Sequence, residues 1–357
     1  MSSKLLPLSV TAALFTGTAM ADVPNVAVDI APVHSLVARV MNGVGTPHLI
    51  IQPGASPHEY NLRPSEAAAL QEADLVFWIG EDLTPWMADA VETLAEDASV
   101  TALLEADATI VLDFREDALF EAHGHEDDDH GHDDHGHDDH AHDDHAHGDH
   151  AHDDHAHDDH AHDDHAHDDH DHDDHAHDDH GHENHAHGDH DPHAWLSPEN
   201  ARIWLNLIAA ELSAADPDNA GAYFANAAAA RAEMEALQAE VDAMLDPVRG
   251  GRFIVFHDAY QYFESAFDFP ASGAISISDA TDPSPARIAE IQSRIREEGV
   301  NCVLAEPQFN AALVATVLDG TDANTGVIDP LGAELAPGPD LYPQVIRNMA
   351  TTLSDCL

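Results

Sequence analysis

The feature that most constrains this chain is a stretch rich in histidine and aspartate, from residue 123 to residue 190. It repeats the pattern H-A-H-D-D with a period of five and holds 27 of the 32 histidines and 26 acidic residues, without lysine or arginine. Its largest apolar side chain is alanine. Burying such residues cannot offset the entropy that is lost when they are ordered, so we expect a solvated insertion rather than a domain.

The rest of the chain alternates between two patterns: short apolar runs typical of strands, and longer amphipathic runs typical of helices. This alternation predicts an α/β fold of two similar lobes, each a parallel four-stranded sheet flanked by helices. The expected strands are 25–30, 48–51, 75–79 and 109–112 in the first lobe, and 252–256, 274–277, 302–305 and 326–328 in the second. The expected helices are 35–41, 64–72, 85–93, 198–214, 258–267, 285–298 and 311–318.

Between the two halves lies a run rich in Ala, Glu, Gln, Leu and Met, residues 219–245. As one helix it would be about 40 Å long, enough to join two lobes, although length alone also allows an ordinary helix of one lobe. We therefore predict an N-terminal lobe over 22–218 that contains the 123–190 insertion, a linker helix over 219–245 and a C-terminal lobe over 246–357.

The first residues have the pattern of an export signal. Lys4 precedes an apolar segment over residues 5–15, and Ala19-Met20-Ala21 forms an A-x-A cleavage pattern. The sequence predicts a signal peptide over residues 1–21, cleaved after Ala21, and a periplasmic mature chain. The apolar segment is too short to span a bilayer and no later window is long enough, so we expect no membrane insertion.

The formal net charge of −57 excludes some partners. The part of the chain outside residues 123–190 contains 43 acidic and 12 basic residues. An acidic surface repels nucleic acid and anionic lipid, so we expect neither as a partner.

Two cysteines, Cys302 and Cys356, lie late in a chain that we expect to be exported. An isolated pair in an oxidising compartment usually forms a disulfide. The alternatives are two free thiols or a metal site, but no histidine lies near either cysteine in the sequence.

Only five histidines lie outside the stretch, and His58, His193 and His257 occur where a loop or strand end can aim the side chain. Ligands of open α/β sheets gather beyond the carboxyl ends of the strands, where Asp329 is also expected. Three neutral imidazoles with a carboxylate or a water make a tetrahedral site suited to Zn²⁺. The sequence therefore predicts a zinc site formed by His58, His193 and His257, with Asp329 or a water as the fourth ligand.

Five ordered segments, GASPHEYNLRPSE, DPHAWLSPEN, FHDAYQYF, AEPQFN and VIDPLG, span nearly the whole mature chain. They resemble segments of the metal-binding solute receptors of ABC transporters, and more narrowly of the zinc receptors of the ZnuA type. The resemblance implies two α/β lobes bridged by one long helix, with the metal in the cleft on His58, His193 and His257. It also supports the Cys302–Cys356 disulfide.

The resemblance carries over incompletely at the fourth ligand. Manganese-binding relatives commonly have a glutamate at the position of His257, so the histidine favours zinc. Some zinc receptors place a carboxylate just before the first histidine, where this chain has Pro57. We therefore expect Asp329 or a water as the fourth ligand. We expect Glu59 and His34 either to support the ligands or to bind the metal themselves.

The function that we expect is capture of Zn²⁺ in the periplasm by a monomer and delivery to the permease and ATPase of an ABC transporter. The insertion would collect zinc weakly near the cleft, through its histidines. The alternatives are a periplasmic zinc buffer or chaperone, a receptor for another divalent metal such as manganese, and a zinc hydrolase, for which the sequence offers no recognisable catalytic set. The histidines expected to collect zinc include His123, His125, His130, His132, His135, His137, His182, His185, His187 and His190.

Overall fold

The computed structural model describes residues 23–115, 190–276 and 283–357. The predicted signal peptide and the insertion histidines His123, His125, His130, His132, His135, His137, His182, His185 and His187 lie outside these ranges. None of the helices within them is long and apolar enough to cross a membrane.

The first lobe contains a parallel sheet with the strand order β2-β1-β3-β4. The central strands β1 and β3 are buried along their whole length, which explains why they consist of Val, Ala, Leu, Phe and Trp. Helices α1, α2 and α3 connect the strands, and each begins with a proline in its first turn, where no hydrogen bond is lost. The elements are β1 (Val26–Val28), α1 (Ala31–Val40), β2 (His48–Leu49), α2 (Pro64–Gln71), β3 (Leu75–Trp78), α3 (Pro85–Leu94) and β4 (Ser99–Ala102).

The second lobe repeats this plan, with the strand order β6-β5-β7-β8. In both sheets the first strand of the lobe lies second in the sheet, and all neighbouring strands are parallel. The prediction of two similar four-stranded α/β lobes is thus confirmed. The elements are β5 (Phe253–His257), α6 (Gln261–Phe267), β6 (Ala274–Ser276), α7 (Pro285–Glu298), β7 (Cys302–Ala305), α8 (Ala311–Leu318) and β8 (Asn324–Val327).

The prediction of a strand at 109–112 was wrong. The fourth strand of the first lobe is β4, an edge strand whose exposed, weakly apolar sequence SVTA gives little strand signal. Ile110 and Val111 are 44% and 38% exposed, so the apolar run that suggested a strand is not buried. The Leu112 carbonyl instead accepts the backbone N–H of Asp191, which brings the two sides of the insertion together.

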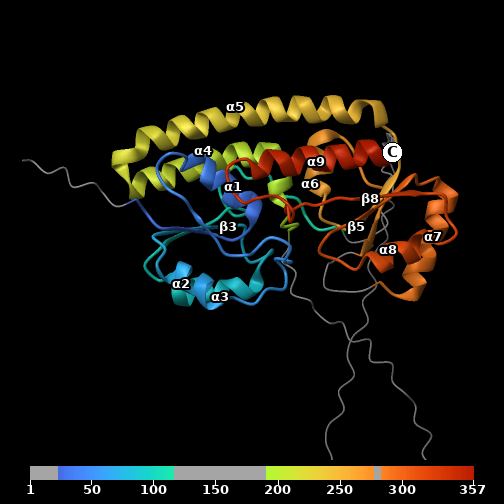
Figure 1. Cartoon of the computed structure of the whole chain (residues 1–357), viewed down its shortest axis with the longest axis horizontal. Helices are drawn as coiled ribbons and strands as arrows, with labels where there is room; N and C mark the ends of the chain where they lie inside the picture. Colours follow the sequence, from blue (N-terminus) through green and yellow to red (C-terminus); the bar gives the residue numbers. More distant parts are fainter. Residues whose placement is uncertain (1–22, 116–189, 277–282) are drawn as a thin grey trace, which may run out of the picture. The chain divides into compact units, whose positions relative to one another are not determined.

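Two long helices connect the lobes. The expected linker is α5 (Ala220–Leu245), which follows α4 (Pro198–Ala215) and buries a stripe of side chains at helical spacing. The second is α9 (Leu341–Cys356), for which the sequence analysis made no prediction. Its first turn meets α1, where the Ser35 hydroxyl accepts the Tyr342 N–H at 2.9 Å, and its end meets β8, where Asn324 donates to the Cys356 carbonyl. The two helices run side by side (Figure 1).

A disulfide joins Cys302 on β7 to Cys356 at the end of α9, with their Cα atoms 5.7 Å apart. The predicted disulfide is confirmed. The larger hydrophobic cluster runs through both lobes, because Val28 and Trp195 belong to the same buried cluster as Tyr260 and Leu353. A smaller cluster, which includes Ile254 and Ile291, lies within the second lobe. The described residues all belong to one compact unit, so both lobes can be described together.

Candidate metal centre

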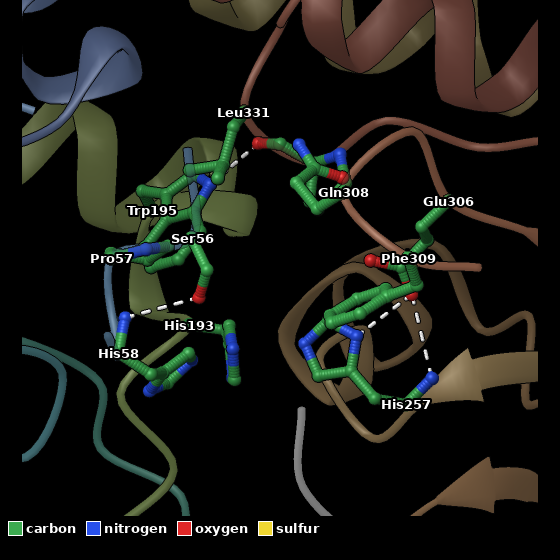
Figure 2. Close-up of a pocket in the computed structure, with 11 residues that line it drawn as sticks. Ser56, Pro57, His58, His193, Trp195, His257, Glu306, Gln308, Phe309 and Leu331 are labelled. Atoms are coloured by element: carbon green, nitrogen blue, oxygen red, sulfur yellow. Dashed lines mark hydrogen bonds and ion pairs between the residues drawn. The ribbon is translucent and has the colours of Figure 1, made fainter. Parts of the chain in front are cut away.

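Three histidines meet between the lobes. His257 is the last residue of β5, and His193 precedes a short 3-10 helix (Ala194–Leu196) that leads into α4. His58 lies in the loop between β2 and α2, where its backbone N–H donates to the Ser56 hydroxyl at 3.3 Å. Figure 2 shows the three rings around one space.

One ligand nitrogen from each ring lies within 4.8 Å of the other two. The ring centres of His193 and His257 are 5.3 Å apart, those of His58 and His193 5.4 Å, and those of His58 and His257 6.5 Å. Nitrogens that share a tetrahedral Zn²⁺ at about 2.0–2.1 Å lie about 3.4 Å from one another. The site is therefore close to coordination geometry, and small side-chain movements would complete it.

Two of the rings are oriented in the same way by a buried carboxylate. Asp191 Oδ1 lies 2.7 Å from His193 Nδ1 and also accepts the backbone N–H of His193. Glu306 Oε1 lies 2.8 Å from His257 Nδ1 and also accepts the backbone N–H of His257. A ring whose Nδ1 donates to a carboxylate keeps the lone pair of Nε2 for a metal and becomes a stronger base.

The electrostatics of Asp191 depend on whether the site holds a cation. Its side chain is 1% exposed, and this burial raises its pKa from 3.8 to about 7, against the lowering effect of the His193 backbone N–H and of the Arg115 charge. A divalent cation beside His193 would favour the ionised carboxylate. Metal binding and ionisation of Asp191 should therefore support each other.

The cavity at the histidines has a volume of about 20 Å³, which is room for about one water-sized particle. Apolar side chains line it together with the rings, among them Pro57, Trp195, Phe309 and Leu331. The indole N–H of Trp195 donates to the Pro330 carbonyl at 2.9 Å, which holds this ring in the wall of the cavity. The space between the rings is therefore about the size of a single ion or water.

The structure does not bring Asp329 into the group of histidines. Its Oδ1 accepts the backbone N–H of Leu331 and Gly332 at 3.1 and 2.9 Å, and its Oδ2 accepts that of Ala333 at 2.6 Å. The carboxylate thus caps the turn of its own loop. The short side chain of an aspartate in a turn readily accepts hydrogen bonds from the backbone N–H groups that follow it. A carboxylate engaged in this way is less available to bind a metal.

The other candidate residues also lie outside the group. Glu59 is exposed, although it is adjacent to His58. His34 is buried in α1, with its Nε2 3.1 Å from the Pro47 carbonyl oxygen, so it fastens α1 to the segment before β2. His190, the one insertion histidine among the described residues, is exposed, with its Nδ1 3.0 Å from Asp113 Oδ1.

Asp191 and Glu306 were not predicted from the sequence as residues that support the ligands. A signal existed for each of them. Asp191 lies two residues before His193, and Glu306 directly follows β7, at a strand end where ligands gather. Neither stood out because the chain has 69 acidic residues.

Comparison with known proteins identifies the family. A family model described as the periplasmic component A of a zinc-uptake complex, ZnuA, matches residues 26–356. The high-affinity zinc uptake system protein ZnuA of Brucella abortus (strain 2308) is 47% identical over 344 residues, covering 96% of this chain and 95% of that protein. The protein of the same name from Paracoccus denitrificans (strain Pd 1222) is 44% identical, covering 98% of each chain.

Solved structures agree on the fold. A crystal structure of ZnuA matches with a TM-score of 0.65 at 19% identity, covering 94% of this chain and 99% of that one. A zinc-bound deletion mutant of ZnuA matches with a TM-score of 0.65 at 20% identity, covering 94% and 98%. The match to the family model and the identity to the curated relatives extend over nearly the whole sequence, so the chain belongs to the ZnuA family of zinc-binding periplasmic components of zinc-uptake complexes.

Proposed function

We propose that this chain captures one Zn²⁺ in the periplasm on His58, His193 and His257 and delivers it to the permease of an ABC transporter. The observation that carries the proposal is the convergence of three imidazole nitrogens within 4.8 Å. With residues 22–218 and 246–357 as the two lobes and 219–245 as their linker, the ion would join a ligand of the second lobe to two of the first.

The ligand set favours zinc over manganese. Within the described part of the chain, the group that could hold a metal consists of three histidines and contains no carboxylate. Nitrogen ligands suit Zn²⁺, whereas Mn²⁺ prefers oxygen. We propose a water as the fourth ligand, because the oxygens of Asp329 are engaged by three backbone N–H groups.

Delivery to a transporter is proposed from the relatives, which are named as proteins of high-affinity zinc uptake systems. We further propose that residues 1–21 direct export and are then removed. Because all three ligands come from one chain, a monomer is sufficient. The 27 histidines of the 123–190 insertion would bind further zinc weakly and raise its concentration near the site.

A zinc titration of the metal-free protein against a competing chelator tests the site. We expect one tightly bound zinc in the wild type, and an affinity weaker by about 100-fold or more in His58→Ala, His193→Ala and His257→Ala. His48→Ala is the matched control, since His48 is exposed and lies outside the group. Wild-type affinity in any of the three ligand variants would contradict the proposed site.

Growth in zinc-depleted medium tests delivery. A strain without the gene should fail to grow there, and the wild-type gene should restore growth while the His257→Ala gene should not. Normal growth and normal zinc uptake in the deleted strain would instead favour the alternative of a periplasmic buffer.

A further inference from the structure

Beside the histidines, the two lobes contact each other through hydrogen bonds and ion pairs among six residues, which we call the clamp. From the first lobe it contains Leu112, Arg115 and Asp191, and from the second Asp258, Tyr262 and Glu264.

The hydroxyl of Tyr262, in the second lobe, bonds two backbone groups of the first lobe. It accepts the N–H of Leu112 at 2.9 Å and donates to the carbonyl of Asp191 at 2.9 Å. The N–H of Asp191 in turn donates to the carbonyl of Leu112 at 2.8 Å. Tyr262 is 1% exposed, so these bonds form away from water, where losing a partner is costly.

The guanidinium of Arg115 makes the second link. Its Nη1 donates to Asp258 Oδ1 at 3.0 Å, and its Nη2 donates to Glu264 Oε2 at 2.8 Å. The two carboxylates are 4% and 5% exposed. An arginine can hold two carboxylates at once because its donors form a planar fork, which a lysine does not have.

The clamp lies directly beside the two buried ligands. Asp191, whose backbone it fixes, is the residue whose carboxylate orients His193. Asp258 follows His257 in sequence, and Tyr262 and Glu264 lie on the helix α6 that comes next. The same bonds therefore act on the position of His193 and on that of His257, one in each lobe.

We propose that Tyr262 and Arg115 are positioning residues for the metal, which hold His193 and His257 at binding distance before zinc arrives. This inference rests on the proposed function. A site that is ordered during folding loses less entropy when the ion binds, so the clamp increases affinity without contacting the metal.

The test compares two tyrosine variants in the full chain. Tyr262→Phe removes one hydroxyl from the clamp. Tyr223→Phe is the matched control, because Tyr223 is equally buried and its hydroxyl donates to Asp216 at 2.8 Å, where α4 ends and α5 follows. Zinc affinity is measured by chelator competition, and the unfolding temperature is measured on the metal-free proteins.

We expect Tyr262→Phe to bind zinc about tenfold or more weakly, in the range found for residues that orient metal ligands. Tyr223→Phe should lower the unfolding temperature but keep zinc affinity within about twofold, because it only loses a buried hydrogen bond. Arg115→Lys should lie between the wild type and Arg115→Met in zinc affinity, since lysine keeps the charge and loses the fork.

If Tyr262→Phe is destabilised as much as Tyr223→Phe and yet binds zinc like the wild type, the clamp has only a structural role and the inference is overturned. The Tyr262→Phe result decides this even if Arg115→Met does not fold. The wild-type titration in the same series tests the proposed function separately. Absence of a tightly bound zinc there would overturn both proposals, whereas equal binding by the wild type and Tyr262→Phe would overturn the clamp alone.

Discussion

His193 and His257 are held by nearly identical arrangements, although they come from different lobes. In each case one carboxylate oxygen accepts both the backbone N–H and the ring Nδ1 of the same histidine. This double contact fixes the ring relative to its own backbone, so Nε2 has a defined direction. The negative charge of the carboxylate also makes that nitrogen a better ligand.

Glu306→Gln tests the contribution of that charge. The amide oxygen of glutamine can still accept a hydrogen bond from the Nδ1–H group of His257, but it carries no negative charge. We expect zinc affinity to fall by about 10- to 100-fold, as measured by chelator competition. Glu298→Gln is the control, since Glu298 is exposed and outside the group, and an equal fall in both variants would contradict this role.

Asp29 gives a prediction for stability and pH. It is completely buried after β1, and its two oxygens accept the N–H groups of Ile30 and Ile79 at 2.7 Å each. Burial raises its pKa from 3.8 to about 7, so the folded state holds a proton that the unfolded state has released. The stability that Asp29 contributes is therefore largest below about pH 4 and declines as the pH rises to about 7.

In Asp29→Asn this decline should be absent, because asparagine does not titrate. Urea unfolding of the metal-free proteins at pH 5 and pH 7.5 should show the wild type losing more stability between the two values than the variant. Asp29→Asn should also be less stable than the wild type at pH 5, by about 1–3 kcal/mol, since one backbone N–H loses its acceptor. Parallel pH profiles would show that Asp29 does not titrate in this range.

The residues of the site were predictable to different degrees. The three histidines could be found because histidine outside the insertion is rare and strand ends are where ligands gather. Asp329 was expected for the same reason, yet its side chain caps a turn. The sequence does not reveal whether an aspartate at such a position binds a metal or accepts hydrogen bonds from its own turn. Asp191 and Glu306 were hidden among many acidic residues.

At the scale of elements, α9 is the part of the fold that the sequence analysis lacked. Strands and helices that alternate along the chain could be predicted from their apolar spacing, but a final helix that returns to the first lobe has no counterpart in that repeat. Its buried residues, Leu341, Val345, Ile346, Met349 and Leu353, follow a helical stripe that was present in the sequence. Which lobe it packs against could not be predicted, because that depends on contacts distant in sequence.

The disulfide fastens the end of α9 to β7, and its removal gives a prediction at this scale. The cysteines are 54 residues apart, and opening such a loop costs about 4 kcal/mol in the chain-entropy model. We expect the double variant Cys302→Ser, Cys356→Ser to unfold at a clearly lower urea concentration. Zinc affinity should stay within about threefold, because neither cysteine lines the metal cavity, and a large loss would mean that α9 also orders the site.

At the scale of the whole molecule, the chain combines one compact unit, which contains both lobes, with an insertion that differs from it in composition. Tight binding is proposed for the compact unit and weak binding for the insertion. Deleting residues 123–185 should therefore preserve one tightly bound zinc and reduce the total zinc bound at high concentration.

Equilibrium dialysis over a range of zinc concentrations measures both quantities in one experiment. The insertion should also lose its zinc first as the pH falls below about 6.5, because protonated imidazole does not bind metal. Zinc that is bound weakly is released by this protonation before zinc that is bound tightly. If the deleted chain lost the tightly bound zinc, the two units would not divide the binding in this way.

The parallel course of α5 and α9 has a mechanical consequence. Two adjacent helices resist twisting, and they resist bending within the plane that contains both of them. They bend more easily at right angles to that plane. Wide separation of the lobes would also expose the hydrophobic cluster that the two lobes share. We therefore expect the metal ion to leave through a movement near the site rather than through separation of the lobes. His58 is the half-exposed ligand and lies on the loop between β2 and α2, so we expect the metal site to open first by movement of this loop.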